Sequence, residues 1–133
     1  MSAEESGDVA TRVMLVDDHI DSLVSVGRLL QLLGYDVRAA LDGMNALMCA
    51  AQFHPDVALI DLSLPGLDGY WVARRLRDLD ATRGTRLIAM TGWTTTDCEW
   101  RTRRAGFERH LVKPVSVDEL TAALTGAMAG THC

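Results

Sequence analysis

Runs of consecutive apolar residues alternate along the chain with longer segments in which apolar residues recur at helical spacing. The runs predict strands at residues 12–17, 56–61, 85–91 and 109–113, and a weaker run predicts another at residues 35–41. Because the apolar residues in these runs do not alternate with polar ones, both faces of each strand should be covered. Strands separated by helix-length segments predict a parallel sheet with helices on both sides.

Local signals define the first and last predicted helices. The first lies within residues 21–35 and should stop at Gly34. Its apolar stripe comprises Leu23, Val26, Leu30 and Leu33. The last helix begins with Ser116 and Glu119, which have the spacing of a capping box. Its buried stripe should comprise Leu120, Ala123, Leu124 and Ala127.

The middle helices have weaker signals. Asp42 should cap a second helix that runs through Gln52, and Asp68 should cap a third. The apolar residues of the third helix should point inward, and these are Trp71, Val72 and Leu76. Its arginines should point outward, and these are Arg74, Arg75 and Arg77. The fourth helix, at about residues 95–105, has few large apolar residues, so it should be the least firmly packed.

Composition limits the class of protein. The 133 residues fit one domain, and a net charge of -5 argues against a general binder of nucleic acids or anionic membranes. No apolar run approaches the roughly 18 residues of a membrane-spanning helix. Cys49, Cys98 and Cys133 are scattered and odd in number, which fits reduced thiols in the cytoplasm.

The chemistry suggested by the sequence lies where the apolar runs end. The polar residues at these ends are Asp17, Asp18, Asp61, Thr91 and Lys113. They should meet in one cleft, because ligands of open parallel sheets bind outside the carboxyl ends of the strands. Three close carboxylates repel one another unless a cation lies among them, and Mg²⁺ prefers such oxygen ligands and accompanies phosphoryl chemistry. A carboxylate can itself serve as the nucleophile and form an aspartyl phosphate.

The chain resembles the receiver domains of two-component response regulators. The matching residues are Asp17-Asp18 after the first strand, Asp61 in "LIDLSLPGLDGY", Thr91 in "AMTG" and Lys113-Pro114 in "LVKP". Each motif alone is weak, but their order and their positions at strand ends are strongly specific together. The resemblance covers a receiver domain at residues 11–129, between a flexible polar N-terminal tail at residues 1–10 and a C-terminal tail at residues 130–133.

The resemblance implies a flavodoxin-like, doubly wound (βα)5 fold with strand order 2-1-3-4-5. It also implies that Asp61 accepts a phosphoryl group from a histidine kinase or a histidine phosphotransfer protein. Asp17, Asp18 and Asp61 would hold Mg²⁺ together with the backbone carbonyl of Ser63. Such a domain assists its own phosphorylation and dephosphorylation, and its output is a change of conformation.

Further residues acquire roles through the same resemblance. Thr91 and Lys113 would bind phosphoryl oxygens, and the bond from Lys113 to Pro114 is expected to be cis. His110 takes the position at which receivers usually have a switch tyrosine or phenylalanine, so its coupling to Thr91 should differ in detail. Trp93, two residues past Thr91, also departs from the commonest receiver pattern, and our hypothesis is that its large ring beside the mouth of the cleft slows hydrolysis of the aspartyl phosphate.

An unknown downstream protein is expected to bind the fourth helix, fifth strand and fifth helix. Trp100, Arg101 and Arg104 are candidates for that surface, because an exposed Trp among arginines has the composition of a binding hot spot. A solvated helix face explains the same residues equally well. Only "GTHC" follows residue 129, which fits either a stand-alone regulator or a receiver cut from a hybrid kinase.

Other functions remain as alternatives. An aspartate-nucleophile phosphatase or phosphotransferase would usually have a second acid two residues after the nucleophile, where this chain has Ser63. A flavodoxin-like cofactor module would need a glycine- or hydroxyl-rich phosphate loop where the chain has "VDDHIDS". A degenerate receiver acting as a scaffold would lack some of the five site residues. His19, Asp21 and His54 are interpreted as surface or capping residues.

Overall fold

The computed structural model describes residues 10–64, 68–92 and 96–126, with only the backbone described for residues 96–100. Strands and helices alternate throughout these residues. The strands are β1 (Arg12–Val16), β2 (Asp36–Ala40), β3 (Val57–Asp61), β4 (Arg86–Thr91) and β5 (Arg109–Val112). The helices are α1 (Ile20–Leu32), α2 (Gly43–Phe53), α3 (Gly69–Asp78), α4 (Thr96–Ala105) and α5 (Val117–Thr125). Nearly all of both predicted tails, Trp93 and Ala127 lie outside the described residues.

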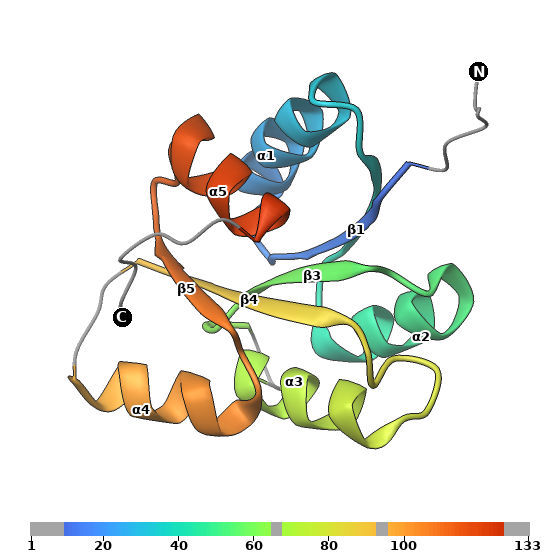
Figure 1. Ribbon diagram of the computed structural model, residues 1–133, viewed down its shortest axis with the longest axis vertical. Coiled ribbons are helices and arrows are strands. Elements are labelled where there is room, and N and C mark those ends of the chain that lie inside the picture. Colours follow the sequence, from blue (N-terminus) through green and yellow to red (C-terminus); the bar gives the residue numbers. More distant parts are fainter. Residues whose placement is uncertain (1–9, 65–67, 93–95, 127–133) are drawn as a thin grey trace.

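The five strands form one parallel sheet in the order β2-β1-β3-β4-β5. Helices α1 and α5 cover one face of this sheet, and α2, α3 and α4 cover the other (Figure 1). The predicted doubly wound fold and its strand order are therefore confirmed. The chain leaves β1 toward β2 on one side and continues through β3 on the other, so the order reverses beside β1. Ligand sites of such sheets lie at this reversal.

A separate apolar core fills the space on each side of the sheet. Leu23 and Leu30 of α1 pack with Leu120 of α5 and with strand residues on one side. On the other side, Ala46 of α2 and Leu76 of α3 are fully buried with the opposite strand residues. Two cores require apolar residues on both strand faces, which explains the consecutive apolar runs.

The position of each strand in the sheet explains the strength of its sequence signal. Every residue of the central strand β3 is buried, whereas the edge strand β2 has three exposed residues among its five. An edge strand has only one neighbour and less helix cover, so fewer of its residues need to be apolar. This accounts for the weaker pattern over residues 35–41.

The predicted helix ends are present in the structure. Asp42 and Asp68 accept hydrogen bonds from backbone N–H groups three residues onward, at 2.8 and 2.9 Å. Ser116 and Glu119 form both hydrogen bonds of a capping box, each 3.1 Å long. Gly34 follows α1 with a φ of 97°, which glycine adopts without the steric cost that other residues pay.

Some of the predicted inward positions are not fully buried in the structure. Leu33, assigned to the buried stripe, caps the C-terminus of α1 and is 43% exposed. The helix ends one residue earlier, and the turn at Gly34 directs Leu33 away from the core. In α3, Val72 and Leu76 are buried as expected, but Trp71 is only partly buried at the edge of its core.

Arg77 was expected to point outward, and this was wrong. It is only partly exposed, and its guanidinium donates hydrogen bonds to the backbone carbonyls of Arg83, Thr85 and Gly106 at 2.6, 2.8 and 3.1 Å. The five N–H groups of a guanidinium can serve several carbonyls at once. Arg77 therefore joins α3 to the loops before β4 and after α4.

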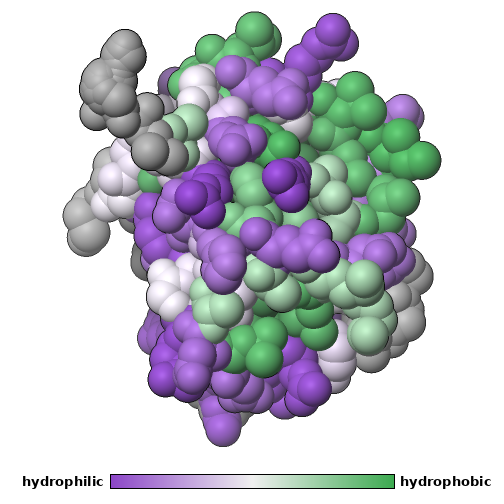
Figure 2. All heavy atoms as spheres, turned by 90° about the vertical axis from the view of Figure 1, so that its right-hand side faces the viewer, coloured by the Kyte–Doolittle hydropathy of each residue, from purple (hydrophilic) through white to green (hydrophobic). Residues whose placement is uncertain are grey.

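The surface mixes hydrophobic and polar side chains, as Figure 2 shows for the face on the α2 side. Met44 and Met48 of α2 are both more than half exposed. Scattered apolar residues of this kind are ordinary on soluble domains. None of the helices in the described part of the chain is both long and apolar enough to cross a bilayer.

Candidate functional site

Asp17 and Asp18 stand where β1 ends, beside the reversal in strand order. The side chain of Asp17 is only 1% exposed, and its Oδ1 accepts a hydrogen bond of 2.9 Å from the backbone N–H of His19. Asp18 is about one-third exposed. Its Oδ1 is nevertheless buried and accepts no hydrogen bond from the described residues, although His19 Nδ1 lies 3.3 Å away. Asp18 therefore offers an oxygen ligand that is not yet used.

Asp61 is the last residue of β3, and its side chain is 4% exposed. Its Oδ1 accepts a hydrogen bond of 2.9 Å from the backbone N–H of Ser63. Leu62 continues the pairing with β4 through a 2.9 Å hydrogen bond to the carbonyl of Met90. The backbone that follows the phosphoacceptor candidate is therefore held in place, and the Ser63 N–H helps to fix the direction of its carboxylate.

Lys113 brings a positive charge to both buried carboxylates. Its Nζ donates to Asp17 Oδ2 at 2.7 Å and to Asp61 Oδ2 at 3.2 Å. The backbone N–H of Lys113 donates to the Thr91 carbonyl at 2.7 Å, and the Lys113–Pro114 peptide bond is cis. The turn after β5 thus aims the ammonium group across β4 and β3 toward β1.

Thr91 lies on β4 and His110 on β5, the two strands that follow β3 in the order of the sheet. Thr91 is buried at the end of β4, directly after Met90, which pairs with Asp61 in the sheet register. His110 is buried in β5, in register with Ala89. Burial lowers the pKa of the His110 imidazole, because its charged form is poorly solvated there.

The pKa values of the three central groups reflect burial and pairing. Burial raises the pKa of the Asp17 carboxyl, but the hydrogen bonds from Lys113 and from the backbone of His19 outweigh it and leave this pKa lowered. In Asp61 burial prevails, so its pKa is raised despite the Ser63 N–H and Lys113. For Lys113 the effect of burial is outweighed by Asp17 and Asp61, and its pKa is raised. The site therefore holds a firmly charged lysine beside two unequal carboxyl groups.

His19 also belongs to this cluster, although the sequence suggested only a surface or capping role. It is the N-cap of α1 without a side-chain cap bond, and it is 68% exposed. Its Nδ1 lies 3.2 Å from Asp17 Oδ1 and 3.9 Å from Asp61 Oδ2. In the sequence, this membership could have been inferred from the position of His19. It directly follows the acidic pair and precedes a helix that begins at the rim of the cleft.

The donor set fits a hard divalent cation. One ligand atom from each of Asp17, Asp18, His19 and Asp61 lies within 4.8 Å of the others. Carboxylate oxygens are the ligands that Mg²⁺ prefers. The ion usually binds one or two carboxylates directly and retains several waters, which can contact a further carboxylate. The buried Asp18 Oδ1, which accepts no hydrogen bond from the described residues, is the observation that supports this fit most directly.

The predicted partner residues lie elsewhere. The Arg101 guanidinium lies 4.2 Å from the centre of the Tyr70 ring of α3, and Arg104 lines a pocket with the same tyrosine. Both arginines therefore lie on the side of α4 that faces α3. Trp100 lies in α4, but its side chain is outside the described residues.

Comparisons with known proteins agree with the fold. Residues 13–125 match the family model of the response regulator receiver domain. Transcriptional regulatory protein PrrA of Mycobacterium tuberculosis is 35% identical over 118 residues, which make up 89% of this chain and 50% of PrrA. The chain thus spans about half the length of that relative.

Two solved structures have the same fold over nearly the whole chain. Chemotaxis protein CheY4 of Vibrio cholerae superposes with a TM-score of 0.85 at 28% identity, covering 90% of this chain and all of CheY4. The receiver domain of sensor histidine kinase PA1611 from Pseudomonas aeruginosa PAO1 superposes with a TM-score of 0.81 at 30% identity, covering 89% and 97%. That structure has a magnesium ion coordinated in its active site cleft.

Proposed function

The chain belongs to the response regulator receiver domain family, and on this basis we propose that Asp61 is the phosphoacceptor of a two-component phosphorelay. The observation that supports this role most strongly is the environment of its carboxylate. Asp61 is buried at the end of β3, has a raised pKa, and lies 3.2 Å from the Lys113 ammonium. A carboxylate whose charge is incompletely compensated is a better nucleophile than one that is fully paired.

In the proposed reaction, an oxygen of Asp61 attacks the phosphorus atom of a phosphohistidine. The new P–O bond forms as the P–N bond breaks, and the departing imidazole nitrogen keeps the electron pair and takes up a proton. Lys113 and the Thr91 hydroxyl bind phosphoryl oxygens. Bound Mg²⁺ supplies positive charge that offsets the charge of the transferring group.

We propose that Asp17, Asp18, Asp61 and the backbone carbonyl of Ser63 hold this ion. The carboxylates are within reach of one another, and the Ser63 backbone is held beside Asp61 by its N–H. A serine two residues after Asp61, where an aspartate-nucleophile phosphatase would have a second acid, favours a regulatory domain over turnover of an external substrate.

The phosphoryl donor is proposed to be a histidine kinase or a histidine phosphotransfer protein. Ile20 and Val24 lie one helical turn apart at the start of α1, directly after the acidic pair, and are 63% and 56% exposed. This apolar pair gives a donor protein a docking point beside the cleft. His19 adds an exposed imidazole at the same rim.

The output of the domain is proposed to be a rearrangement of Thr91, His110 and α4 that alters the surface of α4, β5 and α5. Trp100 remains the candidate contact for a downstream protein on this surface. If the proposal is correct, Trp100→Ala should weaken phosphorylation-dependent binding of that protein. Equal binding by variant and parent would contradict the role of Trp100.

The central proposal can be tested with a small phosphodonor. Incubation with Mg²⁺ and phosphoramidate should add one phosphoryl group, which intact mass and peptide mapping would assign to Asp61. Asp61→Asn should abolish the addition, whereas the control Asp68→Asn, which retains a capping side chain on α3, should leave it intact. Absence of labelling, or labelling at another residue, would overturn the proposal.

A further inference from the structure

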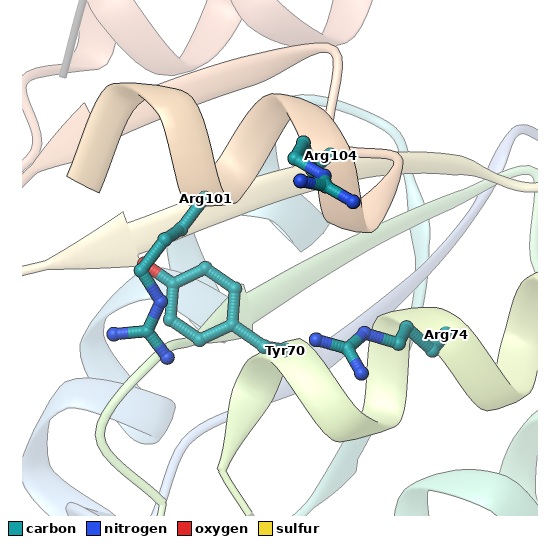
Figure 3. A pocket seen from close by; sticks show the side chains of 4 residues that line it. All are labelled: Tyr70, Arg74, Arg101 and Arg104. Atoms are coloured by element: carbon teal, nitrogen blue, oxygen red, sulfur yellow. The ribbon is translucent and has the colours of Figure 1, made fainter. Parts of the chain in front are cut away.

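A second polar pocket lies between α3 and α4, separate from the acidic cluster. It has a volume of about 590 Å³ and is lined by Tyr70, Arg74, Arg101 and Arg104. Figure 3 shows the arginine side chains of the two helices around the tyrosine ring. We propose that this pocket binds a nucleoside phosphate with two or more negative charges.

Helical spacing explains why these residues converge. Tyr70 and Arg74 are four residues apart in α3, and Arg101 and Arg104 are three apart in α4, so each pair lies on one face of its helix. The two faces meet because α3 and α4 cover the same side of the sheet. The pocket is therefore built on two helices, which position side chains better than a loop does.

Tyr70 gives the pocket a rigid centre. It is 8% exposed, and its ring makes an edge-to-face contact with Phe107 at 6.3 Å between centroids and 82° between planes. Arg101 is held over this ring, with its guanidinium carbon 4.2 Å from the centroid. Stacking on an aromatic ring restricts the guanidinium and reduces the entropy lost when it binds an anion.

The pocket is lined by positive charges, although the chain as a whole has a negative net charge. Three guanidinium groups gather here in a protein with a net charge of -5. Within the described side chains, Arg74 has no carboxylate partner. Burial raises the pKa of the Tyr70 hydroxyl, and the nearby Asp68 carboxylate, which accepts a hydrogen bond from the backbone N–H of Trp71, adds to that rise. Neighbouring like charges repel, and an anion from solution would relieve that repulsion.

The chemistry and size of the pocket favour a nucleotide. Guanidinium groups bind phosphate oxygens in bidentate geometry, and Arg74 and Arg101 together match a ligand with two negative charges. A volume of about 590 Å³ is in the range that holds drug-sized ligands, and it far exceeds what inorganic phosphate would fill. The planar cation of Arg101 at its edge provides a stacking surface for a base.

Titration calorimetry on the complete chain, with EDTA present to remove divalent ions, tests the inference. ADP and GDP serve as nucleotide probes. Pyrophosphate and adenosine represent the two halves of ADP separately. We expect saturable binding of at least one nucleotide, tighter than that of either half. Arg74→Ala and Arg101→Ala should each weaken it by about tenfold or more, and Arg83→Ala, an exposed arginine paired with Asp80, should not change it.

Several results would overturn the inference. These are no saturable binding of any nucleotide, equal binding of pyrophosphate and nucleotide, or unchanged affinity in the Arg74 and Arg101 variants. Binding that requires Mg²⁺ and disappears in Asp61→Asn would assign the nucleotide to the acidic cleft instead. Melting curves that match the parent show that the arginine variants are folded. If Arg101→Ala is unstable, Arg101→Lys keeps the charge, and its expected weaker binding provides the same test.

Discussion

Asp17 and Asp61 share one ammonium group, yet their carboxyl pKa values move in opposite directions. Lys113 is closer to Asp17, at 2.7 Å against 3.2 Å, and Asp17 also accepts the backbone N–H of His19. Asp61 is therefore the less stabilised of the two anions. A group that is strained by its surroundings is often retained because the reaction depends on it. The two aspartates therefore have different electrostatic environments although they belong to one cluster.

His110 should make stability depend on pH. Burial lowers the pKa of the His110 imidazole in the folded chain. Below about pH 6.5 this imidazole therefore binds a proton more readily in the unfolded chain than in the folded chain. The free energy of unfolding should fall as pH decreases from 6.5 toward the folded pKa, at up to about 1.4 kcal/mol per pH unit. Denaturant titrations at pH 7.5 and 5.5 should show a smaller difference for His110→Gln than for the parent.

The exposed histidine His54 provides the control for this measurement. His54→Asn should retain the full pH dependence, because asparagine also tolerates the left-handed backbone at this position, where φ is 51°. If the pH dependence of His110→Gln equals that of the parent, the buried imidazole is not responsible for it.

His19 should influence which metal the cleft prefers. Its Nδ1 is 3.2 Å and 3.3 Å from carboxylate oxygens of Asp17 and Asp18. An imidazole nitrogen favours Zn²⁺ or Ni²⁺ over Mg²⁺, which prefers oxygen. In His19→Ala, calorimetry should therefore show at least about tenfold weaker Zn²⁺ binding with Mg²⁺ binding unchanged or stronger. A parallel loss of both metals would contradict a selective role for the nitrogen.

The elements illustrate which parts of the fold a single sequence can reveal. Central strands such as β3 were evident because both of their faces are buried, and capped helix starts were evident at Asp42 and Ser116. Arg77 was misjudged because its partners are backbone carbonyls of distant loops, which have no residue-specific pattern. Helical spacing alone cannot distinguish a solvated arginine from one that fastens two loops.

The start of α3 is packed directly against the backbone of Asp61, the proposed phosphoacceptor. A Cβ atom added at Gly69 would lie 2.6 Å from the carbonyl oxygen of Asp61 and 2.9 Å from the Cα of Leu62. Gly69→Ala should therefore displace Asp61 and destabilise the domain by about 1–3 kcal/mol. It should also slow phosphorylation more than the loss of stability explains, when rates are compared under conditions in which both proteins are folded.

Gly84 is a suitable control for this substitution, because a Cβ atom there would meet nothing within 4 Å. Gly84→Ala should change the stability by no more than about 0.5 kcal/mol and leave phosphorylation unchanged. If Gly69→Ala behaves like Gly84→Ala, the close approach of α3 to Asp61 affects neither the stability of the domain nor its phosphorylation.

At the scale of the whole molecule, the acidic cleft could be predicted and the arginine pocket could not. The cleft depends on strand ends, and parallel topology brings these together once strand order is known. The pocket depends on how α3 and α4 face each other. That relation rests on packing around Tyr70 and Phe107, which no short motif encodes.

Metal binding should stabilise the whole domain. At a Mg²⁺ concentration ten times its dissociation constant, the free energy of unfolding should rise by about 1.4 kcal/mol, or roughly 4 °C in melting temperature. Calorimetric melts with and without Mg²⁺ measure this. Asp18→Asn removes the negative charge of the carboxylate whose Oδ1 lacks a hydrogen bond and should reduce the shift sharply. A melting temperature that is insensitive to Mg²⁺ in the parent would exclude a metal site of useful affinity.

The hydrogen bond between Lys113 and Asp17 joins residues 96 positions apart in the chain. It can form only after β5 has taken its place at the far edge of the sheet, and distant pairings of this kind are completed late in folding. A chain released from the ribosome before residue 113 would have the aspartates but no ammonium group between them. If Asp61 is phosphorylated as proposed, that modification would require a chain that has been synthesised beyond residue 113 and has folded, and shorter fragments would remain unmodified.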